Sequence, residues 1–350
     1  MKKLFFAMGV IALSVVAVSC NSETKAEKNT FIPESVETIN IDNYKVAEGA
    51  EMDSLAYTLG ANMGLQANFE LSELEIDSEL LLKFMLDTYE KGVLDNSDTA
   101  KDQQRIDEFQ YEQFYPRMMA QYQGTPVEEL PAFFNDEYTK EEFTGLNGRM
   151  MGRTLVLLKE DIDAKWAVAG MLDAFAIESQ ETMFDGLRLT EEQLMEQSGA
   201  LRAIIMQRGE ELQARLMAEN ASASAEWLAE IEQMEGVQKT ESGLLYRIDR
   251  EGSDVKATAD TDVVEVNYEG KLRTGDIFDS SYERGESISF PLNGVIKGWT
   301  EGMKLVGEGG QITLWIPAEL GYGERGAGSD IGPNEALEFK VELIKVNPEN

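Results

Sequence analysis

From about residue 242 onward, the hydrophobic residues of this chain recur at every second position, whereas earlier they follow a helical period. Such alternation is typical of strands in a sheet that is buried on one face. A short helical stretch from Gly298 to Leu305 interrupts it. Residues 241–350 are therefore predicted to form an α+β domain, a curved antiparallel sheet with a short helix on its concave face. The alternating apolar positions are Val264, Val266, Tyr268, Ile312, Leu314, Ile316, Leu337, Phe339, Val341 and Leu343.

The part of the chain before this domain has the pattern of an all-α region, which we place at residues 48–240. Apolar residues gather on one helical face around Leu59 and on a second helical face around Phe84. Either Asp77 or Ser78 is a suitable N-cap for the second of these helices.

Two more helices are predicted in this region. Residues 98–123 have a helical pattern that is acidic and aromatic, and Pro116 is expected to interrupt it. Residues 190–235 predict one long linking helix, because a capping box of Thr190 and Gln193 precedes a regular apolar stripe.

The first helical pair is repeated later in the chain, at residues 139–177. The simplest explanation is a duplicated helical hairpin, since two copies are too few for a solenoid array. The sequence leaves open whether the two copies pair within one chain or between two chains. The matching positions are Gly60, Met63, Gly64, Ile76-Asp77 and Met85-Leu86-Asp87 in the first copy, and Gly148, Met151, Gly152, Ile162-Asp163 and Met171-Leu172-Asp173 in the second.

Residues 1–20 have the pattern of a secretion signal, with two lysines followed by an apolar run. The run ends in Ala17-Val18-Ser19-Cys20, which resembles a bacterial lipobox with Cys20 as the lipidated first mature residue. An ordinary signal peptide with an incidental cysteine is the alternative. Residues 21–47 are polar and predict a flexible tether. We expect a protein of the cell envelope, lipid-anchored at the periplasmic face or the outer membrane.

Composition excludes several kinds of chemistry. The 350 residues include no histidine and a single cysteine, Cys20. Nucleophile pairs with histidine, histidine metal sites and an intrachain disulfide are therefore impossible. No loop has the ligand spacing of a calcium site, so neither a metal nor a cofactor is predicted. The formal net charge of −34 argues against nucleic acid as a partner, although solubility alone explains such a charge.

Several short motifs follow one another through the alternating domain: Ser242-Gly243-Leu244-Leu245-Tyr246, Val266-Asn267-Tyr268-Glu269-Gly270, Phe278-Asp279-Ser280-Ser281, Val295-Ile296-Lys297-Gly298-Trp299, Ile316-Pro317, Leu320-Gly321-Tyr322-Gly323 and Phe339-Lys340-Val341-Glu342-Leu343. In order and spacing they resemble the FKBP-type peptidyl-prolyl isomerases. The helical half with its long helix resembles the dimerising N-terminal part of the macrophage infectivity potentiator branch, from which the doubled hairpin departs. This second resemblance implies a homodimer through the N-terminal helices.

The first resemblance implies an apolar pocket for a proline ring. Trp299 would form its floor, and the walls would be Tyr268, Phe278 and Phe339. Taken singly, an aromatic residue at strand spacing is more often a core residue than a site residue. Only the joint order of the motifs favours the pocket.

The resemblance also implies polar contacts in this pocket. Asp279, held by Tyr268 and Arg284, would lie beside the twisting amide, and the Tyr322 hydroxyl and the Ile296 N–H would donate hydrogen bonds to the substrate. Asp279 alone is equally consistent with a turn residue. The implied catalytic residues are Tyr268, Phe278, Asp279, Trp299, Tyr322 and Phe339, and the implied substrate-binding residues are Ile288, Val295, Ile296, Ile331 and Arg284.

The expected function is that of a peptidyl-prolyl cis-trans isomerase that assists the folding of exported proteins. Its partners would be proline-containing, unfolded or partly folded exported chains, and it would need no cofactor. The alternative is a membrane-tethered holdase chaperone, whose helical half grips unfolded envelope proteins while the sheet domain has little activity. The methionines of the helical half allow this second activity, because methionine suits adaptable binding surfaces.

Overall fold

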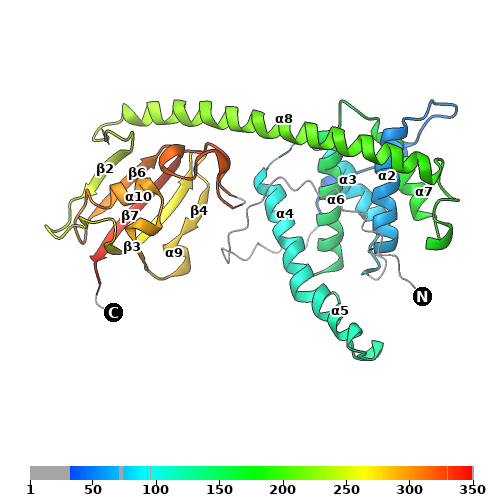
Figure 1. The fold of residues 1–350 in the computed structure, drawn as a ribbon, viewed down its shortest axis with the longest axis horizontal. Helices are drawn as coiled ribbons and strands as arrows, with labels where there is room; N and C mark the ends of the chain where they lie inside the picture. The colour runs from blue at the N-terminus through cyan, green and yellow to red at the C-terminus, as the bar shows by residue number, and fades with distance from the viewer. Residues whose placement is uncertain (1–31, 71–73, 93, 95, 329, 349–350) are drawn as a thin grey trace. The chain divides into compact units, whose positions relative to one another are not determined.

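The structure is a computed structural model that describes residues 32–70, 74–92, 94, 96–328 and 330–348 (Figure 1). The predicted signal and Cys20 lie outside these residues. The described chain forms two compact units, which divide between Glu211 and Leu212 inside the long helix α8 (Glu191–Glu232). The predicted boundary at 240/241 is displaced because the second half of α8 packs with the sheet. Among the described residues, no helix is long and apolar enough to cross a membrane.

The two hairpin copies of the helical unit pack against each other, helix by helix, within one chain. Helix α2 of the first copy packs against α7 of the second, and α3 packs against α6. Each helix of one copy therefore has its main partner in the other copy, and both partners belong to the same chain. The four helices are α2 (Ser54–Leu65), α3 (Ser78–Lys91), α6 (Lys140–Leu157) and α7 (Ala164–Phe175).

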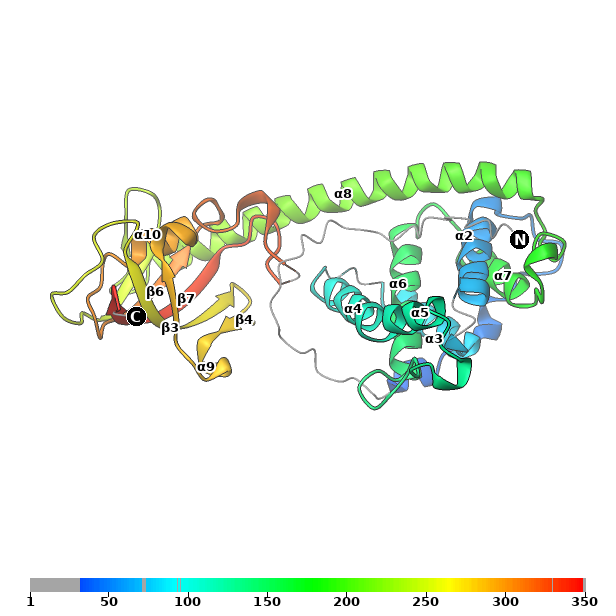
Figure 2. The same ribbon diagram turned by 60° about the horizontal axis from the view of Figure 1, so that its bottom comes forward.

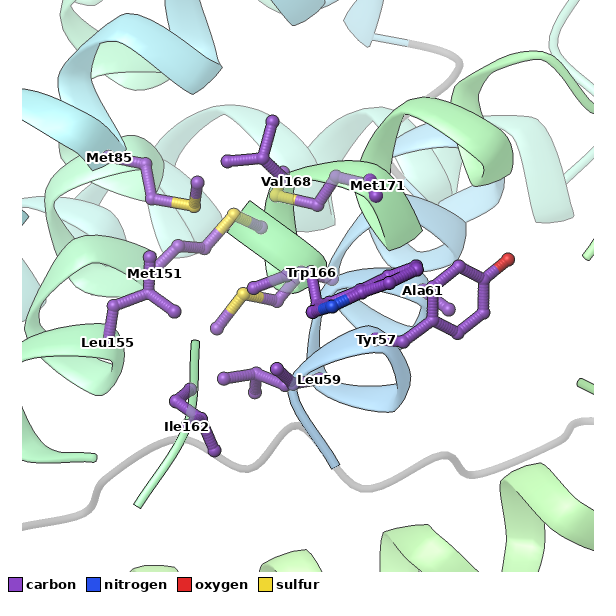
Figure 3. Packing of buried hydrophobic residues seen from close by; sticks show 14 of the residues in the cluster. Tyr57, Leu59, Ala61, Met85, Met151, Leu155, Ile162, Trp166, Val168 and Met171 are labelled. Atoms are coloured by element: carbon purple, nitrogen blue, oxygen red, sulfur yellow. The ribbon is translucent and has the colours of Figure 1, made fainter. Parts of the chain in front are cut away.

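The repeated glycines explain how the paired helices approach each other. A Cβ on Gly60 would lie 1.7 Å from the carbonyl oxygen of Ala167, and a Cβ on Gly148 would lie 2.7 Å from that of Leu81. Side chains larger than hydrogen are therefore excluded at both crossings. The repeated methionines Met85, Met151 and Met171 are buried in the shared core (Figure 3). They fill the core and form no binding surface.

The predicted helix starts are confirmed. Asp77 caps α3, accepting hydrogen bonds from the N–H groups of Glu79 and Leu80. At the start of α8, Thr190 and Gln193 form the reciprocal capping box, with bonds of 3.0 and 3.3 Å. The long helix runs without interruption over its 42 residues.

The predicted tether is wrong for its second half. Residues 34–46 contain a short helix, α1 (Glu34–Glu37), and a 3₁₀ turn, η1 (Ile41–Tyr44). Val36 is fully buried, and Ile39 belongs to the core of the helical unit. Apolar side chains at these positions dock the segment, and only 21–31, outside the described residues, stays a predicted tether.

Between the two copies, the chain forms a separate helical segment. It consists of α4 (Asn96–Phe109), the π-turn η4 (Gln110–Phe114) and α5 (Tyr115–Tyr122). Helix α4 packs on α6, with the ring centroids of Phe109 and Phe143 4.3 Å apart, and α5 extends away from the four-helix core (Figure 1). The interruption predicted at Pro116 is therefore present, as a π-turn followed by a new helix. The helical unit also contains the π-turn η2 (Gln66–Glu70) and the 3₁₀ turns η5 (Val127–Glu129) and η6 (Gln180–Thr182).

The second unit is the predicted antiparallel sheet, and the α+β fold class is confirmed. The strand order is β1-β2-β6-β7-β3-β4, and β5 pairs with β3 beside β4. The strands are β1 (Gln238–Lys239), β2 (Leu245–Arg250), β3 (Val263–Leu272), β4 (Ile277–Ser280), β5 (Ile288–Pro291), β6 (Gln311–Ile316) and β7 (Leu337–Val346). The helical turns are α9 (Ser281–Arg284), η7 (Leu292–Gly294), α10 (Lys297–Gly302), η8 (Ala318–Leu320) and η9 (Gly323–Arg325).

The short helix α10 lies against β6, on one face of the sheet (Figure 2). A Cβ on Gly298 would meet Ile316 Cγ2 at 2.6 Å, and a Cβ on Gly302 would meet Leu314 at 2.7 Å. The two glycines therefore let the helix lie close to the strand. This close approach places Trp299, between them, in the core of the sheet unit.

The end of α8 joins the sheet through a small separate cluster. Ile231 of α8 is buried with Leu245 of β2 and Trp315 of β6. The Trp315 indole N–H donates to Glu338 at 2.7 Å. Trp315 is thus a structural residue.

Candidate active site

The site is organised around the indole of Trp299, which α10 presents to the rings of two strands. Tyr268 of β3 and Phe339 of β7 each meet this indole edge to face, with ring centroids 5.2 Å apart and planes at 89°. Edge-to-face packing places the positive ring edge against the negative ring face, which favours this arrangement. All three side chains are buried.

Phe278 of β4 extends the cluster through Phe339. Their centroids are 5.5 Å apart, with planes at 88°. Gly270 of β3 makes this packing possible, since a Cβ there would lie 2.7 Å from Phe278 and 2.8 Å from Phe339. The predicted floor residue and three wall residues therefore come together.

One aromatic neighbour of Trp299 was missed by the sequence reasoning. Phe290 of β5 lies with its centroid 5.2 Å from that of Trp299, at 60° between the planes. It stands two positions after Ile288 on the same strand, so the period of two offered a signal. The two residues share a face of β5.

A closed polar network lies beside the rings. The Tyr268 hydroxyl donates to Asp279 Oδ2, the Arg284 Nη1 donates to Asp279 Oδ1, and the Arg284 Nη2 donates to the Tyr268 hydroxyl oxygen at 2.9 Å. Burial, together with the hydrogen bond to Asp279, raises the pKa of Tyr268 from its ordinary value to about 12. The phenol therefore stays protonated, and its proton is held by Asp279. The predicted link of Asp279 to Tyr268 and Arg284 is present.

The remaining predicted residues divide between the core and the exposed edge. Ile331 is buried in the same core as the rings, and Val295 and Ile296 pack against that core. Ile296 is the N-cap of α10, so its N–H has no acceptor within the helix. Ile288 is 40% exposed and Tyr322 is 39% exposed, and neither belongs to the buried cluster.

The comparisons with known proteins agree with this fold. Residues 255–344 match the family profile described as FKBP-type peptidyl-prolyl cis-trans isomerase. Residues 140–248 match the domain amino-terminal to that isomerase, so the first hairpin copy and the segment after it lie outside both matches. The chain belongs to the FKBP-type peptidyl-prolyl cis-trans isomerase family and has the activity of that family.

Among individual relatives, the chain is similar to the probable FKBP-type isomerase FkpA of Neisseria meningitidis, with 38% identity over 61% of this chain and 76% of that protein. It is 35% identical to FkpA of Escherichia coli K12 over 64% of this chain and 81% of that protein. The crystal structure of Escherichia coli FkpA aligns with a TM-score of 0.50 at 36% identity, covering 62% of this chain and 99% of that one.

Proposed function

We propose that the ring cluster, formed by Trp299, Tyr268, Phe278 and Phe339, is the catalytic site. In this proposal the cluster favours the twisted X–Pro amide over both planar forms. The observation that carries this proposal is the enclosure of Trp299 by Tyr268 and Phe339, next to the paired carboxylate of Asp279. Trp299 is the floor for the proline ring. The Ile296 N–H and the Tyr322 hydroxyl hold the substrate backbone.

The physical basis is differential binding of the transition state. Amide resonance opposes rotation with a barrier of ~18–20 kcal/mol. A twisted amide has lost this resonance and is less dipolar than a planar amide. Moving it from water to an apolar ring surface therefore costs less free energy than moving the planar amide, and the rotation barrier falls. Because each ~1.4 kcal/mol gives a tenfold rate, a few such contacts suffice. No nucleophile or cofactor takes part.

An isomerisation assay on a short X–Pro peptide tests this proposal. We expect Asp279→Leu in the mature chain to lower kcat/KM at least about tenfold, because the carboxylate that holds Tyr268 and Arg284 is lost. Asp254→Leu, on an exposed loop of the same unit, is the control and should leave kcat/KM unchanged. Equal rates for both variants and the unaltered chain would remove this site assignment.

The clients that we propose are exported proteins, reached from a lipid anchor on Cys20 in the cell envelope. The support is the sequence of residues 1–20, with its apolar run ending at a cysteine. Fractionation of cells labelled with radioactive palmitate tests this. The unaltered protein should carry label in the membrane fraction, and Cys20→Ser should not. An unlabelled, freely soluble wild-type protein would contradict the anchor.

One observation favours holdase activity as a second function. Helix α5 exposes a stripe of apolar side chains at helical spacing, which are Tyr115, Met118, Met119 and Tyr122, with exposures of 49, 37, 55 and 88%. No residue of α5 is buried. Flexible methionines and amphipathic tyrosines suit binding of varied unfolded segments. This stripe, and not the buried methionines of the core, is the surface that we assign to client binding.

Aggregation of a denatured client separates the two functions. Replacing all four stripe residues with serine should abolish suppression of aggregation while leaving kcat/KM on a short peptide unchanged. The control replaces the exposed Glu192 and Glu196 of α8 with serine. If the stripe variant still suppresses aggregation of the client, the stripe is not the surface that binds unfolded chains.

A further inference from the structure

The second half of α8 is hydrogen-bonded to the loop that precedes β7. The Ser224 hydroxyl donates to the carbonyl oxygen of Asn334 at 3.0 Å and accepts from the N–H of Ala336 at 2.9 Å. One turn earlier, the Asn220 Nδ2 donates to the carbonyl oxygen of Pro333 at 3.0 Å. Ser224 is only 5% exposed. One face of α8 therefore satisfies consecutive backbone groups of this loop.

The same loop is bonded on its other side to the candidate site. Ile331 lies in the core with the rings, and its N–H and carbonyl pair with those of Ala327 at 3.1 and 2.9 Å. The Asn334 N–H donates to the carbonyl oxygen of Gly323, which directly follows Tyr322. Asn334 thus connects α8 with the chain that carries Tyr322.

The conformation of the loop depends on this contact. Asn334 has a φ of +55°, in the left-handed region that few residues adopt, and its Nδ2 donates to the carbonyl oxygen of Met217 of α8 at 3.2 Å. A Cβ on Gly332 would lie 2.8 Å from the Asn220 Nδ2, so a larger residue there would push the Asn220 side chain out of its place. The helix and the loop are therefore fitted to each other residue by residue.

We propose that α8 is a positioning element of the isomerase site, in which Ser224 and Asn220 hold the loop that places Tyr322 and Ile331 against the substrate. The inference rests on the proposed role of Tyr322 and on the substrate-binding role that the family resemblance implies for Ile331. The ring cluster stands on β3, β4, β7 and α10, and none of these bonds from α8 reaches those elements. Loosening the loop should therefore weaken substrate binding and change the preference for the residue before proline, with little effect on kcat.

Kinetics of the mature chain on a series of X–Pro peptides tests the inference. Ser224→Ala should raise KM roughly threefold to tenfold, as expected when buried backbone groups lose their hydrogen-bond partner. It should also alter the order in which the enzyme prefers the residues X before proline. Hydrogen exchange of the Ala336 amide should accelerate in the same variant. Ser222→Ala, exposed on the same helix, is the matched control. Identical KM, ranking and exchange in the two variants would overturn the inference.

Two further variants keep the outcome decisive. Asn220→Ala carries the test if Ser224→Ala fails to fold, with the same expectations for KM and ranking. Ile331→Ala tests the underlying site assignment. If it leaves KM and ranking unchanged, the proposed role of Ile331 fails. If it changes them while the two α8 variants do not, the positioning role of α8 fails.

Discussion

Gly60 of α2 and Ala167 of α7 approach so closely that a Cβ on the glycine would lie 1.7 Å from the Ala167 carbonyl oxygen. The obstacle is backbone, which cannot move aside without separating the helices. We expect Gly60→Ala to lower the free energy of unfolding of the helical unit by about 3 kcal/mol or more, as severe overpacking does. Urea unfolding followed by far-UV circular dichroism measures this.

Gly199 of α8 is the matched control, since a Cβ there meets nothing within 4 Å. Gly199→Ala should raise the free energy of unfolding by about 0.5–1 kcal/mol, because alanine loses less entropy in a helix. Equal effects of the two substitutions would contradict the close helix crossing.

The packing of the two hairpin copies within one chain predicts the oligomeric state. Because α2 pairs with α7 and α3 with α6, the helical faces that would pair with a second chain are already occupied. We expect the protein without residues 1–20 to sediment as a single chain. A fragment of residues 140–350 lacks both partners and should self-associate. A dimer of the longer chain that persists on dilution would restore the homodimer that the sequence suggested.

Two buried tryptophans distinguish the site from the remaining core. Trp299 belongs to the ring cluster, whereas Trp315 packs with Ile231 and Leu245. Both leucine variants should lose stability, by less than the roughly 3–5 kcal/mol typical of Trp→Ala, because leucine refills part of the cavity. Only Trp299→Leu should also lower kcat/KM at least about tenfold, measured on folded protein. A similar loss in Trp315→Leu would show that stability, and not ring geometry, controls the rate.

We expect the contribution of Asp262 to the free energy of unfolding to depend on pH. Its carboxylate accepts from the N–H groups of Thr258 and Ala259, each at 2.8 Å, and these bonds lower the pKa of Asp262 to about 2. A folded pKa below the unfolded value stabilises the fold above about pH 4, and the stabilisation disappears as pH falls towards 2. The difference in urea midpoint between wild type and Asp262→Ala should narrow over that range. A constant difference would contradict this assignment.

The sequence predicted the elements well because their signals are local. Apolar residues at every second position predicted the strands that carry Tyr268 and Phe339. The repeated glycines and methionines indicated the duplicated hairpins. The capping residues Asp77 and Thr190 marked helix starts. The motif order also selected the rings that meet around Trp299, although Phe290, on a short strand with one neighbouring apolar position, lacked a signal strong enough to be chosen.

Tertiary structure decided what depends on which segments meet. The sequence placed the unit boundary after α8, since a helix has no internal sign of which partner each half contacts. It assigned residues 34–46 to a tether, because single apolar residues such as Val36 show their burial only when a core is present. The packing of the two hairpin copies and the bonds from Ser224 to Asn334 join positions far apart in the chain. Periodicity reports which face of a segment is apolar, whereas the partner of that face is fixed only when the whole chain packs.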